Sequence, residues 1–138
     1  MSMNAALLVM ARWVVLIGGL VIIADLATQA IMQRSTGQDV LDQLDSANKV
    51  INVVLFSILG AVVARQTGLF YLSALAGLLA SLLDAAVVLT ASSMAPPPGG
   101  TVPVDTYLLL NVAFGVIPAG ISGFVSSMVE RASGPRSR

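Results

Sequence analysis

Apolar residues fill four long stretches of the chain, separated by short polar connections. A helix needs about 20 mostly apolar residues to cross the hydrocarbon core of a bilayer. The pattern predicts four spans, the second of which is short but follows helix-compatible residues: about 13–31, 50–64, 69–92 and 107–129. Because they use most of the chain, we expect one all-α transmembrane domain over residues 1–138, built as a four-helix bundle.

The polar stretch before the second span has a helical pattern of its own. Its apolar residues recur at intervals of four, three and four: Val40, Leu44, Ala47 and Ile51. Its acidic residues recur every third position along another side: Asp39, Asp42 and Asp45. These intervals predict an acidic outer helix at about 38–49 that leads into the second span. Its acidic side is either a plain solvated face or a surface that docks a partner or attracts cations weakly.

Basic residues orient the spans, because Lys and Arg collect in short cytoplasmic loops. With four spans, the termini and the second connection share one side, which holds five of them: Arg12, Arg65, Arg131, Arg136 and Arg138. The other side holds Arg34 and Lys49. We therefore expect a multi-pass protein of the cell membrane with both termini in the cytoplasm. Residues 1–10 carry no basic side chain, so we expect a retained first span rather than a cleaved signal peptide.

The chain matches itself at an offset of 59 residues. That offset places Asp25 on Asp84, the two acids within spans, and Asn52 on Asn111. The match predicts two tandem helical hairpins, at about 12–66 and 71–132, that share one orientation and are related by a pseudo-twofold axis along the membrane normal. Chance matching of apolar letters is the alternative, because the identity is low.

Composition excludes several function classes. Hydrophobic residues make up 57% of the chain and charged residues 10%, whereas soluble domains carry about 25% charged residues. There is no Cys and no His, which removes disulfides, His-ligated metals, iron–sulfur clusters and a His general base. The sequence also lacks a P-loop and a dinucleotide-binding fingerprint. We expect no enzyme, cofactor, metal or nucleic acid, and as partners the lipid bilayer with other membrane subunits or a second copy.

Polar residues within the spans form the candidate site. An ionisable residue in a span costs roughly 2.5–3.5 kcal/mol and is by default a functional hypothesis. Counting residues along each helix places both acids in the outer half of the bilayer, with the two Asn near the same leaflet. The predicted intramembrane polar site comprises Asp25, Asp84, Asn52, Asn111, Ser81, Thr28 and Gln29.

Three interpretations of this polar group stay open. Carboxylate, amide and hydroxyl oxygens suit a hard cation or a protonation switch. A structural alternative has neutral Asp bonding to Asn across the bundle, at about 0.6 kcal/mol per contact. In the third, an Asp meets an Arg or a cofactor of another subunit.

Small residues along the spans predict where the helices approach closely. The expected packing positions are Gly18, Gly60, Gly77, Gly115 and Gly123. Pro118 is expected to kink the last span. Tyr107 is the first residue of the fourth predicted span, a position where an aromatic side chain is typical of the membrane interface.

These patterns favour a small non-catalytic integral membrane protein that packs against partners, either as an accessory subunit of a membrane complex or as a homo-oligomer. The alternative is a minimal ion- or proton-linked transporter or channel that uses Asp25 and Asp84.

Overall fold

The computed structural model describes residues 1–96 and 103–133, and over these residues the protein is all-α. Its elements are α1 (Met3–Met32), α2 (Gln38–Thr67), α3 (Tyr71–Met94) and α4 (Val104–Ala132). Each helix is long and apolar enough to cross a membrane. The expectation of an all-α protein with four potential membrane spans is therefore confirmed. Arg136 and Arg138 lie outside the described residues.

Two of the helices begin well before the predicted spans. α1 begins at Met3, ten residues before the expected span, where the Ser2 hydroxyl accepts a hydrogen bond from the backbone N–H of Ala5 (3.3 Å). α2 joins the acidic stretch and the second apolar stretch in one helix of 30 residues, because no proline interrupts it. It ends at Gly68, whose φ of 70° is a left-handed conformation that glycine adopts without strain.

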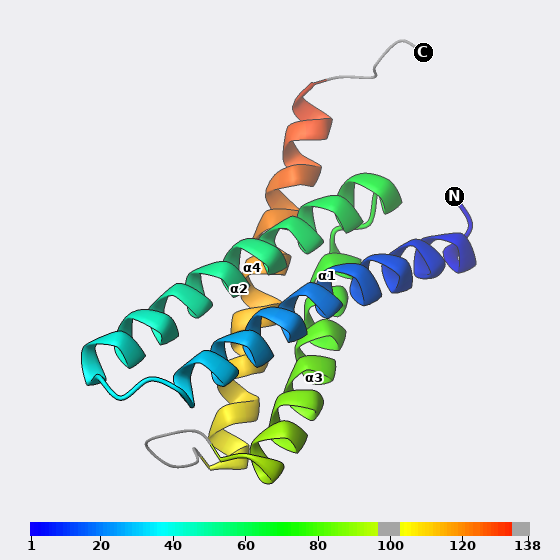
Figure 1. The fold of residues 1–138 in the computed structure, drawn as a ribbon. Coiled ribbons are helices and arrows are strands. Elements are labelled where there is room, and N and C mark those ends of the chain that lie inside the picture. Colours follow the sequence, from blue (N-terminus) through cyan, green and yellow to red (C-terminus); the bar gives the residue numbers. More distant parts are fainter. Residues whose placement is uncertain (97–102, 134–138) are drawn as a thin grey trace.

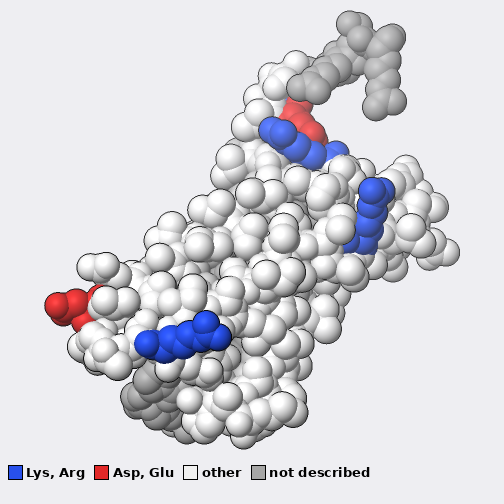
Figure 2. Space-filling view, in the orientation of Figure 1, with Lys and Arg blue, Asp and Glu red and all other residues white. Residues whose placement is uncertain are grey.

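The helices form two antiparallel hairpins, α1–α2 and α3–α4, which cross at an angle (Figure 1). The start of α1, the end of α4 and the α2–α3 connection lie toward one end of the molecule, and the α1–α2 connection, the end of α3 and the start of α4 lie toward the other. Charged side chains visible on one face gather at these two ends and leave an uncharged band between them (Figure 2). This distribution suits helices whose middle sections face lipid.

The apolar core lies where α1 packs against α2 and α3. On α1, the buried residues recur every three or four positions, which places them on one helical face: Ala6, Met10, Val14, Ile17 and Val21. They meet three residues of α2 and three of α3: Phe56, Leu59, Val63, Leu72, Ala76 and Ala80. Within the described residues, the backbones of α1 and α4 are not adjacent, because α2 and α3 lie between them.

α4 packs against α2 and α3 through small residues. A Cβ at Gly60 would collide with the backbone of Ala119, and one at Gly77 would collide with that of Gly115. Likewise, a Cβ at Gly123 would collide with Ser73, whose hydroxyl donates to the Gly60 carbonyl (2.8 Å). These contacts are close because the glycines lack side chains, which allows backbones to approach in the way that is typical of helix pairs in lipid.

The remaining expected packing glycine, Gly18 on α1, faces Ala80 of α3, and a Cβ there would lie 3.3 Å from the Ala80 Cβ, which is tighter than an ordinary van der Waals contact but not a collision. Pro118 lies inside α4 without ending the helix. The contacts of α4 are therefore tighter than those of α1, which are made mainly by larger aliphatic side chains.

Candidate intramembrane polar site

Asp25 of α1 is held by two amides of α2. Its Oδ1 accepts hydrogen bonds from Asn48 Nδ2 (2.6 Å) and Asn52 Nδ2 (2.8 Å). The two Asn residues are four positions apart, so they lie one turn apart on the same face of α2. Thr28, almost one turn beyond Asp25, donates to Asn48 Oδ1 (3.2 Å), so the Asn48 amide uses both of its ends within the hairpin.

Asp84 of α3 has the equivalent partner in the second hairpin. Asn111 Nδ2 of α4 donates to Asp84 Oδ2 over 2.8 Å. Each Asp lies 27 residues before the Asn that bonds to it, both for Asp25 with Asn52 and for Asp84 with Asn111. The same contact is therefore made once in each hairpin. Asp84 is completely buried, whereas Asp25 is half-buried.

The two carboxyl groups belong to one cluster, because Asp25 and Asp84 lie close enough to interact directly. Tyr107 of α4 lies within electrostatic reach of both. The chain supplies no countercharge: in residues 1–96 and 103–133 the one ion pair is Lys49 with Asp45 on the exposed surface. Two neighbouring carboxyl groups inside a bundle therefore stand without a cationic partner from the described chain.

Two acceptor atoms in this cluster are buried without a hydrogen bond from the described residues. They are Asp84 Oδ1 and Asn52 Oδ1. Burying such an oxygen without a donor costs free energy, and native structures rarely leave it so without a bound water, ion or functional reason. The cluster therefore has acceptor capacity in excess of the donors that these helices provide.

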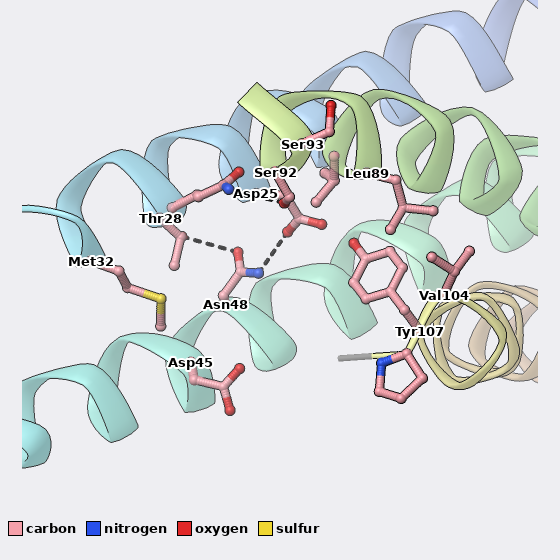
Figure 3. Close-up of a pocket in the computed structure, with 13 residues that line it drawn as sticks. Asp25, Thr28, Met32, Asp45, Asn48, Leu89, Ser92, Ser93, Val104 and Tyr107 are labelled. Atoms are coloured by element: carbon pink, nitrogen blue, oxygen red, sulfur yellow. Dashed lines mark hydrogen bonds between the residues drawn. The ribbon is translucent and has the colours of Figure 1, made fainter. Parts of the chain in front are cut away.

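A cavity of about 510 Å³ reaches the cluster from the end of the molecule where α1 ends and α4 begins (Figure 3). All four helices contribute to its walls, and they include residues of α1 and α4, whose backbones are not adjacent. Asp25 and Asn48 form a polar side, and Figure 3 shows the Tyr107 hydroxyl pointing toward the Asp25 carboxyl group. Much of the remaining wall is apolar: Met32, Val88, Leu89, Pro103 and Val104.

The structure brings together most, but not all, of the residues that the sequence singles out. Gln29 lines the cavity and donates to Ser92 (3.0 Å) and, more weakly, to the Ala95 carbonyl (3.4 Å). Ser81 lies apart, since its hydroxyl donates to the Leu78 carbonyl of its own helix (3.0 Å). It packs against Gly115, so its small size serves the α3–α4 contact rather than the polar cluster.

Sequence reasoning missed three residues of this site. Asn48 lies in the acidic stretch, but its position one turn before Asn52 was a usable signal. The position of Tyr107 at the edge of its span predicts a residue of the membrane interface and gives no sign that its side chain lines the cavity. Ser92 carries no signal in the sequence, because hydroxyl groups are common at helix ends.

A metal centre has no ligand set in the part of the chain that is described, because no three His, Cys, Asp or Glu side chains come together there. Comparison of this chain with models of protein families, with curated proteins and with solved structures found no match.

Proposed function

We propose that this chain is a multi-pass protein of the cell membrane, with both termini in the cytoplasm, that acts as a minimal ion- or proton-linked carrier or channel. In this proposal Asp25 and Asp84 hold the cation or proton. In this orientation the cavity opens on the outer side, because it lies at the end opposite the start of α1 and the end of α4. The role is binding and passage rather than catalysis.

The unpartnered oxygens of Asp84 and Asn52 carry this proposal. In a purely structural Asp–Asn contact, the buried acceptors would be matched by donors of the bundle. Here both Asp84 Oδ1 and Asn52 Oδ1 lack one among the described residues, beside a second carboxyl group at Asp25. A proton or a small cation supplies what these acceptors lack, and it offsets the repulsion between two neighbouring carboxylates.

The paired contacts also support a duplication. Asn52 with Asp25 and Asn111 with Asp84 make one contact per hairpin at the same spacing and the same 2.8 Å length. We propose that the hairpins arose from one ancestral unit and are related by a pseudo-twofold axis along the membrane normal. The carboxyl groups then meet because the axis passes near both of them.

Flux measurements in liposomes test the proposal. The purified protein is reconstituted, and proton, Na⁺ and K⁺ fluxes are followed with an interior pH dye and ion-selective dyes. We expect flux of at least one of these ions, and we expect Asp25→Asn and Asp84→Asn to abolish it. The matched control is Asp39→Asn, since Asp39 is exposed and lies outside the cavity. Absence of flux in the unchanged protein, or flux that survives both substitutions, would contradict the proposal.

A second candidate is an accessory subunit or homo-oligomer. It is favoured by the exposure of α4. In the most apolar 18-residue segment of α4, 17% of the residues are buried within the chain, against 44% in the corresponding segment of α3. That surface contacts lipid or another protein. In native membranes, crosslinking through α4 that captures a second copy or a defined subunit, together with no flux in liposomes, would favour this candidate over the carrier.

A further inference from the structure

We propose that the cavity beside Asp25 binds an organic monocation with an apolar body, such as a quaternary ammonium compound. This inference rests on the proposed function and names the class of ligand that the outer part of the site takes. The cavity has a charged wall that suits the ammonium group and apolar walls that suit the hydrocarbon body of such a ligand. A carboxyl group lies on one side, and aliphatic and aromatic side chains surround the rest.

The charge of the cavity selects for cations. Asp25 and Asp45 line it, and no Lys or Arg is among its lining residues. Asp45 is engaged by Lys49 at the surface, so its charge is compensated. Asp25 has only neutral amides as hydrogen-bond donors, from Asn48 and Asn52, so no cation of the described chain balances its charge.

The size and chemistry of the walls argue against a bare metal ion as the main occupant. A cavity of about 510 Å³ is many times larger than the roughly 30 Å³ share of one water molecule. A hard metal cation such as Ca²⁺ needs about six to eight oxygen ligands at close range. Here a large part of the lining is made of carbon atoms, from residues such as Met32, Leu89 and Val104.

Tyr107 gives the cavity an aromatic wall. Its ring lies between the apolar residues of α3 and α4 and the Asp25 carboxyl group (Figure 3). An alkylated ammonium group bound against Asp25 would therefore lie beside the face or edge of a phenol ring. Aromatic rings attract quaternary ammonium groups, which shed their hydration more easily than metal ions do.

Binding to the full-length protein in detergent, measured by isothermal titration calorimetry, tests this inference. The probes are benzyltrimethylammonium, tetramethylammonium, Na⁺ and neopentylbenzene, the neutral analogue in which carbon replaces the nitrogen. We expect benzyltrimethylammonium to bind about tenfold or more tighter than tetramethylammonium, because the benzyl group buries further apolar surface. Na⁺ and neopentylbenzene are expected to bind far more weakly.

Variants assign the binding to the cavity. Asp25→Asn should abolish benzyltrimethylammonium binding, and Tyr107→Leu should weaken it several-fold, while Tyr107→Phe retains it because the ring remains. Asp39→Asn is the matched control, and circular dichroism with gel filtration shows that each variant is folded. Equal binding of the neutral analogue, displacement by equimolar Na⁺, or unchanged binding by folded Asp25→Asn would overturn the inference.

The outcomes separate this inference from the proposed function. Organic-cation binding without any flux in liposomes would overturn the carrier and leave the ligand assignment standing. Proton or Na⁺ flux in a protein that binds none of the organic probes would overturn the ligand assignment alone.

Discussion

Asn111 donates a hydrogen bond to Asp84 over 2.8 Å, and this is the one hydrogen bond that the described residues donate to the completely buried Asp84. In the first hairpin, the corresponding carboxyl group, that of Asp25, has more than one donor. Asp25 accepts from Asn52 and also from Asn48. The two hairpins therefore share a contact but differ in how far each carboxyl group depends on it.

This difference predicts unequal effects of removing the two Asn residues. Asn111→Leu, which keeps a similar volume, leaves Asp84 without its donor and is expected to lower stability by about 1–3 kcal/mol. Asn52→Leu is expected to cost less, because Asn48 still donates to Asp25 over 2.6 Å. Denaturation in mixed micelles, followed by circular dichroism, measures both. An equal or larger loss for Asn52→Leu would contradict this view of the site.

The glycine contacts of α4 predict that alanine substitutions at two different glycines have unequal effects on stability. Gly60→Ala places a methyl group against the backbone of Ala119, which no rotamer change can relieve, so α2 and α4 must separate. We expect a loss of about 1–3 kcal/mol, as for other overpacked sites. Gly19→Ala is the matched control, because a Cβ there meets nothing within 4 Å, and alanine favours the helix. Thermal unfolding of both variants in the same detergent gives the comparison; a stable Gly60→Ala protein would be contrary to this packing.

The proposed orientation predicts which side of the membrane each end of the molecule faces. The chain contains no Cys, so single substitutions give single thiols. Ser93→Cys, exposed beside the cavity, should react with a membrane-impermeant maleimide on intact cells. Ser133→Cys, at the end of α4, should react only after the membrane is permeabilised. The reverse pattern would place the cavity on the cytoplasmic side and overturn the assigned topology.

The sequence predicted the helices well, for a plain physical reason. Long apolar stretches have few alternatives to helix in lipid, so the four elements follow from the pattern alone. Their ends do not, because the cap at Ser2 and the uninterrupted run through the acidic stretch make α1 and α2 begin before the predicted spans.

The site was harder to predict than the helices. Asp25, Asp84, Asn52 and Asn111 stand out because polar groups are costly in apolar stretches. Which of these groups form hydrogen bonds with one another depends on the register between helices. The pattern of apolar residues does not specify that register. The cavity depends on the separation of α1 from α4, a property of packing that no single stretch contains. Ser81 is the reverse case, because the sequence predicts a member of the polar site where the small side chain serves close packing against Gly115.

The apolar core described above also limits how the protein can work. Toward the termini, the space between α1, α2 and α3 is filled by fully buried side chains, including Phe56, Leu59 and Val63. The polar cluster thus has an entrance toward one end of the molecule and a plug of apolar side chains toward the other. Under the proposed function and orientation, the structure corresponds to an outward-open state, and a carrier cycle requires the apolar plug to part while the entrance closes. α1 is the helix best suited to that movement, because glycine-mediated contacts hold α4 tightly against α2 and α3.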